Sequence, residues 1–182
     1  KTVMVWETIV NKYCAGNSPL RELLVLHSSS VAQKALQIVK EHPELEADAQ
    51  FIEEAAMLHD IGIVLTNAPA IHCLGNNEYI CHGYLGADLL RKEGYEAYAK
   101  VCERHTGAGI TANQIETQQL PLPKDREYMP QSIEEKIICF ADKFFSKTSP
   151  DREKSVEQAE KSLAKFGTEG VERFREWCKL FL

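Results

Sequence analysis

The chain has 182 residues, of which 44% are hydrophobic and 26% are charged, and its formal net charge is −6. This length is enough for one domain with a hydrophobic core, and the composition is ordinary for a soluble globular protein. The negative charge excludes a global basic field for nucleic acid, and no apolar stretch approaches the roughly 20 residues that span a bilayer. We therefore expect one domain with neither a nucleic-acid nor a membrane partner.

Helix start and stop signals divide the first half of the chain into predicted helices. Ser18-Pro19 predicts a helix start, with serine as N-cap and proline at the first helical position. A second helical stretch, around residues 31–39, ends before a proline. A third helix is predicted over about residues 48–59, with Gly62 as its stop. Residues 63–81 then predict a loop.

The second half is also helical, and no segment shows the period-2 alternation of a strand. Capping patterns of the Ser/Thr-x-x-Glu/Gln type begin three of its helices. The fold class is therefore predicted as all-α. The further helices are expected over about residues 82–94 and 95–105, in a short segment after Thr111, over 133–146, and after Ser155 and Thr168.

The six cysteines form no Cys-x-x-Cys pair. In a chain of this size they predict buried apolar residues in a reducing compartment, and so a cytoplasmic protein. The N-terminus lacks a basic-then-apolar signal pattern. The apolar C-terminus could pack on the core or on a second copy, so a homo-oligomer is left open.

The run His59-Asp60-Ile61-Gly62 stands at the end of an apolar, helix-patterned segment. Its histidine and aspartate offer one neutral nitrogen and one anionic oxygen, a pair that suits a divalent metal. Two adjacent residues cannot complete a metal site, so further ligands must come from other helices.

Helical register places several other ionisable residues on apolar faces. Taken singly, each histidine is interpreted as a satisfied core residue, and Asp142 could form a buried salt bridge. A buried carboxylate is costly unless it is paired or bound to metal. One shared metal cluster would satisfy all of these ionisable groups together, and we favour that interpretation. The groups are His27, His59, Asp60, His82, His105 and Asp142.

The order His27 … His59-Asp60 … Asp142 resembles the HD-domain superfamily of metal-dependent phosphohydrolases, in the subgroup with the His-Asp-Ile-Gly spelling. The segments His27–Ala35 and Ala141-Asp142-Lys143 also match. The resemblance covers about residues 20–146. It implies a single HD domain over 1–182, a helical bundle with flanking helices at about 154–182.

By this resemblance, His27, His59, Asp60 and Asp142 hold one metal. His82 and His105 match the extra histidines of members with two metals, such as diadenosine polyphosphate hydrolases, and Asp60 would bridge. The donor set suits iron or manganese, with zinc, nickel, cobalt or magnesium also open. The implied reaction is attack of a metal-bridging hydroxide on phosphorus. The implied enzyme is a phosphatase or phosphodiesterase acting on a small phosphorylated metabolite, for which we expect a nucleotide.

Four residues are candidates for substrate contact, each with a plainer alternative. Lys143 is a candidate catalytic cation and phosphate contact, or a lysine paired with a nearby acid. Thr106, before Gly107, could bring backbone N–H groups to the phosphate or only mark a helix end. Arg152, like Lys147 in the same loop, could reach a leaving group or face solvent. His72 could be a general acid or lid contact, or a loop histidine bonded to backbone.

Two other functions stay open at this point. HD-fold proteins with the same six ligands include mixed-valent di-iron oxygenases, which cleave C–C or C–P bonds. A non-catalytic metal- or nucleotide-binding module is the second. The cation-rich segment 143–154 favours a phosphate substrate, and the complete ligand set favours turnover.

Overall fold

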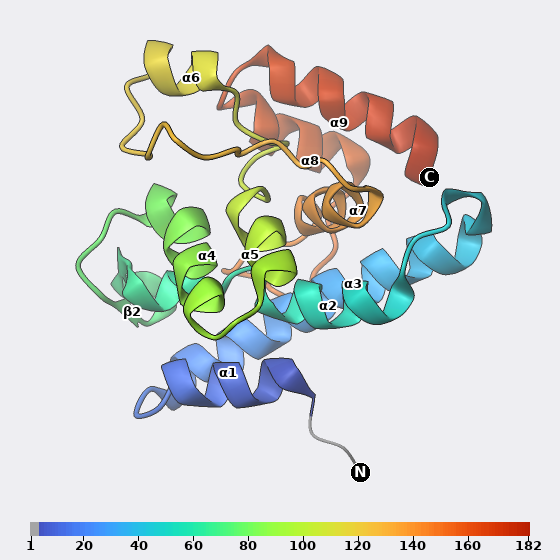
Figure 1. The fold of residues 1–182 in the computed structure, drawn as a ribbon. Helices are drawn as coiled ribbons and strands as arrows, with labels where there is room; N and C mark the ends of the chain where they lie inside the picture. Colours follow the sequence, from blue (N-terminus) through green and yellow to red (C-terminus); the bar gives the residue numbers. More distant parts are fainter. Residues whose placement is uncertain (1–3) are drawn as a thin grey trace.

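The longest element is α2 (Ser18–Glu41), which packs against α3 (Ala49–Leu58) and α7 (Ile133–Asp142) (Figure 1). This computed structural model describes residues 4–182. The side chain of Asn17, one residue before the predicted cap, accepts a hydrogen bond from the Leu20 N–H at 3.2 Å. The two helical stretches predicted here form one helix, because no glycine or proline separates them.

The other helices surround this trio. A pair, α4 and α5, packs side by side and contacts α3 through α5, while α8 and α9 pack on each other and reach α7 through α9 (Figure 1). Except for α1, which was not predicted from the sequence, their positions agree with the predicted helices to within a few residues. They are α1 (Val5–Tyr13), α4 (His82–Lys92), α5 (Glu96–Glu103), α6 (Ala112–Thr117), α8 (Val156–Ala164) and α9 (Thr168–Phe181).

The predicted capping patterns are present at α6 and α8, where both bonds of the capping box form. At α7 the Ser132 hydroxyl accepts from the Glu135 N–H, but the Glu135 carboxylate accepts from Gln131 and Arg104 instead of closing the box. The prediction that α7 continues to residue 146 was wrong. It ends at Asp142, after which i→i−3 backbone hydrogen bonds tighten the chain into turns.

Residues 63–81 are less irregular than predicted. They contain a two-residue antiparallel pair, β1 (Asn67–Ala68) and β2 (Cys73–Leu74). Strands this short cannot show an alternating pattern, so they could not be predicted from the sequence. Short 3₁₀ turns complete the segment: η2 (Ile61–Leu65), η3 (Pro69–Ile71) and η4 (Tyr79–Cys81). A further one, η1 (Pro43–Leu45), follows α2.

Gly62 does not stop a helix, as the sequence had predicted. It lies inside η2, and α3 has already ended at Leu58. A Cβ at this position would lie 1.9 Å from the His82 carbonyl oxygen and 2.6 Å from the Gly86 nitrogen. The missing side chain therefore allows α4 to approach the backbone beside His59 and Asp60, and this approach positions His82.

The C-terminal helices close the core over α7. The ring of Phe140 lies 5.0 Å from that of Phe174 and 5.3 Å from that of Phe181, centre to centre. Trp177 and Phe181 are buried, so half of the apolar C-terminus packs on the core. Leu180 and Leu182 remain exposed.

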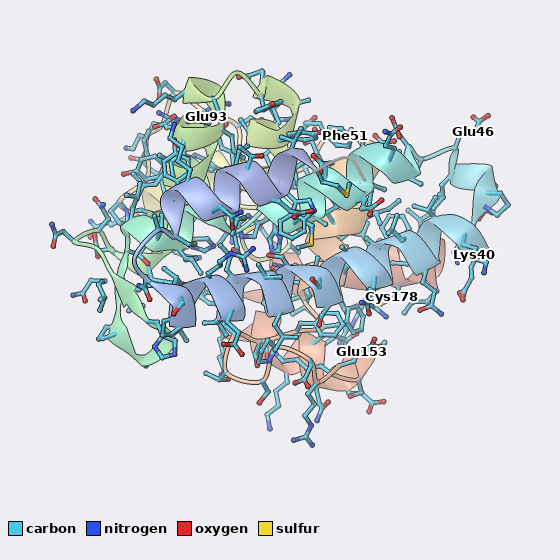
Figure 2. The ribbon with its side chains drawn as sticks, turned by 90° about the horizontal axis from the view of Figure 1, so that it is seen from below. Lys40, Glu46, Phe51, Glu93, Glu153 and Cys178 are labelled. Atoms are coloured by element: carbon cyan, nitrogen blue, oxygen red, sulfur yellow. The ribbon has the colours of Figure 1, made fainter. Side chains whose placement is uncertain are left out.

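Surface ion pairs tie neighbouring elements together. Glu93, labelled at the α4–α5 turn beside α1 in Figure 2, accepts hydrogen bonds from Lys12 and Tyr13, both at 2.7 Å. Over residues 4–182, no helix has the length and apolar character needed to cross a membrane.

Candidate metal centre

Six buried side chains from five segments of the chain converge. All six were predicted from helical register. His27 comes from the middle of α2 and Asp142 from the last residue of α7. His59 and Asp60 follow α3, His82 begins α4, and His105 follows α5. Their donor atoms form two sets, each within 4.8 Å of one another: His27, His59, Asp60 and Asp142, and Asp60, His82 and His105.

Asp60 belongs to both sets and turns one oxygen toward each. Its Oδ2 lies 3.1 Å from the Nε2 of His27 and 3.1 Å from that of His59. Its Oδ1 lies 3.3 Å from the Nε2 of His82 and 3.0 Å from that of His105. A carboxylate placed in this way can join two neighbouring cation sites.

Three of the four imidazoles are oriented by the same contact with the backbone. The Nδ1 atoms of His59, His82 and His105 each lie 2.6 Å from a backbone carbonyl oxygen three residues earlier. A proton on Nδ1 that is donated to this carbonyl leaves the lone pair of Nε2 facing the cluster, as metal ligation requires. His27 differs, because its Nδ1 has no hydrogen-bond partner among the described residues.

The acids of the cluster are held as anions. Burial alone would raise the pKa of Asp60, but His59 and Lys147 hold it well below its ordinary value. Burial likewise opposes ionisation of Asp142, but Lys143 and His27 lower its pKa well below the usual range. Burial lowers the pKa of His105 to about 4, so this imidazole is neutral near pH 7.

His59 is the exception among the imidazoles. Burial opposes its protonation, but the Asp60 and Asp142 carboxylates raise its pKa to about 10. Without a bound cation, this histidine therefore carries positive charge between two acids.

The residues fit a divalent metal. Both oxygens of Asp60 are buried and, among residues 4–182, neither has a partner in hydrogen-bond geometry, although four imidazole nitrogens lie within 3.3 Å of them. Several donors around one carboxylate, close but not hydrogen-bonded to it, is the arrangement expected of ligands that share a cation. Imidazole and carboxylate donors together suit transition metals better than magnesium.

Two lysines from the segment after α7 reach the cluster. Lys143 donates from Nζ to the His105 carbonyl oxygen at 2.9 Å and to Asp142 Oδ2 at 2.7 Å. The Nζ of Lys147 lies 3.0 Å from Asp60 Oδ2. The sequence predicts Lys147 as a loop cation that could reach a leaving group or face solvent; the turn after Asp142 carries it inward, to Asp60.

The three remaining candidates for substrate contact differ in burial and position. Thr106 is half-buried in the loop after His105 and lines a cavity there. Arg152 and His72 are exposed. The His72 carbonyl accepts from Asn17 Nδ2, and over the described chain no hydrogen bond or ion pair joins either side chain to the cluster. Substrate contact by these two residues stays a prediction.

Comparison with known proteins identifies a family. The HD domain model matches residues 24–146. Two relatives named tRNA (cytidine(56)-2'-O)-methyltransferase, from Picrophilus torridus and Thermoplasma volcanium, are 35% identical over 126 residues and 33% identical over 149 residues. These matches cover 69% and 81% of this chain but only 32% and 38% of the relatives, so the chain spans about a third of their length.

A third relative is similar in length. The uncharacterized protein MJ0778 of Methanocaldococcus jannaschii is 32% identical over 162 residues, which are 87% of this chain and 84% of that protein.

Two solved structures share the fold. Both are of the HD domain of the phosphodiesterase PgpH from L. monocytogenes, and one is a complex with cyclic-di-AMP. The TM-scores are 0.55 and 0.53, at 14% and 15% identity. The similarity covers 92% of this chain and 93% of the first structure, and 93% and 92% for the complex.

Proposed function

This chain belongs to the HD-domain family, and from that premise we propose that it is a metal-dependent phosphohydrolase acting on a small phosphorylated compound, in particular a nucleotide. The observation that carries the proposal is the shared position of Asp60. One carboxylate faces two separate sets of imidazole donors, which supports a centre for two cations. His27, His59, Asp60 and Asp142 would hold the first, and Asp60, His82 and His105 the second.

Divalent ions bound there would supply Lewis-acid polarisation of a phosphoryl group and would make a nearby water more acidic. Iron and manganese suit this donor set best. The protein's own part is to orient His59, His82 and His105 through the carbonyls behind them, and to keep both carboxylates ionised.

Lys143 and Lys147 supply fixed positive charge beside the centre. Lys143 is anchored by two acceptors, so its ammonium loses little freedom when a phosphate approaches. Preorganised cations of this kind stabilise the charge that develops on phosphoryl oxygens during transfer. The two lysines favour a phosphate ester over the neutral polyol of an oxygenase that cleaves C–C bonds.

Methyl transfer, which the names of two relatives state, is not proposed for this chain. The matched segment is about a third of each of those proteins. A cluster of imidazoles and carboxylates with adjacent lysines suits hydrolysis of a phosphate ester better than movement of a methyl group.

The test is a parallel assay on the purified protein. Its metals are measured, and phosphate release from a panel of nucleotides and sugar phosphates is followed alongside O₂ uptake with manganese or iron present. The proposal predicts phosphate release without O₂ consumption. O₂ uptake without phosphate release would instead identify an oxygenase.

A further inference from the structure

Two adjacent cavities lie beside the metal centre, on the side of the C-terminal helices. The first, of about 160 Å³, is bounded by Asp142 and Lys143 from the centre and by Lys154 and Ser162 from the following segment. We name it the phosphate cavity. The second, of about 90 Å³, lies between the loop 106–110, α6 and the α8–α9 turn, and we name it the ring cavity. Gly107, Leu163 and Phe166 line both cavities, so the two are adjacent, and we name them together the groove.

The phosphate cavity has the charge of an anion site. Lys154 donates from Nζ to Ser162 Oγ at 3.3 Å, and Lys143 is fixed on the opposite side by His105 and Asp142. Asp142 is the one acid that lines the cavity, and its charge is already matched by Lys143. The charge of Lys154 therefore remains for a bound phosphate.

The ring cavity is mostly apolar. Ala108, Ile110 and Leu163 are buried in its lining, while Phe166, which lines both cavities, is 61% exposed. An aromatic side chain at the edge of an apolar cavity offers a stacking surface to a planar ligand.

The ring cavity also carries polar groups at its rim and a rigid wall. The amide side chains of Gln114, on α6, and of Gln118, one residue past the end of that helix, line it. The guanidinium of Arg173 on α9 donates to the carbonyl oxygens of Ala108 and Gly109, and so fixes the loop that forms the wall. Amide donors and acceptors around an apolar slot suit a heteroaromatic ring better than an alkyl chain.

We propose that this groove binds a nucleoside phosphate, with the phosphate at Lys154 beside the metal centre and the base in the ring cavity against Phe166. The inference rests on the proposed function and deepens it, because it assigns the choice of substrate to α6, α8 and α9. The C-terminal helices lie outside the residues that the HD domain model matches. The wall that α8 and α9 supply is thus outside the matched residues, whereas α6 and the loop 106–110 lie within them.

The chain offers a variant that closes the ring cavity without disturbing the fold. Gly170 lies in the first turn of α9, and a Cβ there meets only Ala108 Cβ, at 3.8 Å, an ordinary contact. In Gly170→Leu the added side chain would fill the cavity from this side. Gly170→Ala is the matched control, since it improves helix propensity but leaves the cavity open. Lys154→Ala removes the phosphate contact, and Lys161→Ala, on the exposed face of α8, is its control.

Binding is measured by calorimetry with three non-hydrolysable phosphonates, which correspond to AMP, ribose 5-phosphate and an octyl phosphate. The AMP analogue is expected to bind about tenfold or more tightly than the other two. Gly170→Leu should abolish this preference, and Lys154→Ala should weaken the AMP and ribose analogues by similar factors. The two control variants should bind as the wild type does.

Three results would overturn the groove assignment: equal affinity for the AMP and ribose analogues, preferred binding of the octyl compound, or a preference for AMP that survives Gly170→Leu. Absence of binding by all three would overturn it as well. Phosphate release on the same preparation separates the two proposals. Hydrolysis with equal KM for AMP and ribose 5-phosphate contradicts the groove alone, whereas no release from any ester contradicts the proposed function.

Discussion

The ammonium nitrogen of Lys147 lies 3.0 Å from Oδ2 of Asp60, the carboxylate shared by both sets of metal-ligand candidates. The same nitrogen lies 5.6 Å from the centre of the Tyr79 ring. Burial lowers the pKa of Lys147, but Asp60 and Tyr79 outweigh burial and raise it, so the side chain is cationic near neutral pH. The segment after α7 thus delivers a permanent positive charge to the centre of the cluster.

Replacement of this charge should lower the rate of phosphate release but leave the amount of bound metal unchanged. Lys147→Met keeps the length of the side chain and removes the ammonium, and phosphate release should fall by about a hundredfold. Metal content, measured by mass spectrometry, should stay that of the wild type. Lys40→Met, at the exposed end of α2, is the control and should retain full activity. Unchanged turnover in the Lys147 variant would show that this lysine takes no part in the reaction.

The contrast between Lys147 and the six clustered residues shows what the sequence can reveal. His27, His82 and Asp142 were predicted because each shares a helical face with apolar residues, and a period of 3.6 fixes where such a face points. Lys147 lies in a turn, where no period applies. Its inward direction depends on the i→i−3 hydrogen bonds that follow Asp142, and those could not be read from residue types.

Loss of one donor from the second set should remove one metal and leave the other. In His105→Ala the metal content is predicted to fall from about two ions per chain to about one, and phosphate release should be lost. His42→Gln provides a control, because His42 pairs with Glu44 near the start of η1, on the surface. Full metal content in His105→Ala, or a single metal in the wild type, would contradict the two-cation arrangement.

Gly62 is predicted to be indispensable for packing. In Gly62→Ala the new methyl group would overlap the His82 carbonyl oxygen, so the free energy of unfolding should fall by about 1–3 kcal/mol or more. Gly170→Ala, at a helical position with free space, should instead raise it by roughly 0.5–1 kcal/mol. Urea unfolding of both variants checks the contrast. Equal stability of the two variants would mean that α4 can move away from η2 at little cost.

The role of Gly62 also marks a limit of sequence reasoning. A glycine after a helix is most often a C-cap, so the stop was the natural interpretation. The true reason is contact with His82 and Gly86, residues that are distant in sequence. Close approach between two backbones leaves no local pattern by which it could be predicted.

Glu54 should make stability depend on pH. Burial raises the pKa of this carboxyl, which accepts a 3.4 Å hydrogen bond from the Trp6 N–H at the start of α1. Because the pKa of Glu54 is raised in the folded state, its protonated carboxyl stabilises the fold fully below the unfolded-state pKa of about 4.3. This stabilisation is lost as the pH rises through the folded-state pKa.

Glu54→Gln removes this dependence. The stability of the variant relative to the wild type should therefore increase between about pH 4 and pH 7, as measured by urea unfolding. Glu53→Gln, at the exposed neighbouring position, should show no such trend. If the stability of Glu54→Gln relative to the wild type stays constant or decreases over this range, burial does not raise the pKa of Glu54.

The shared carboxylate of Asp60 is tested most directly by Asp60→Asn, which keeps the shape of the side chain and removes its charge. Metal content and phosphate release are measured on the same preparations of variant and wild type. The wild type should hold about two ions per chain and release phosphate, and the variant should lose metal and show no release above background. Phosphate release that persists in the Asp60 variant would contradict a reaction centred on this cluster.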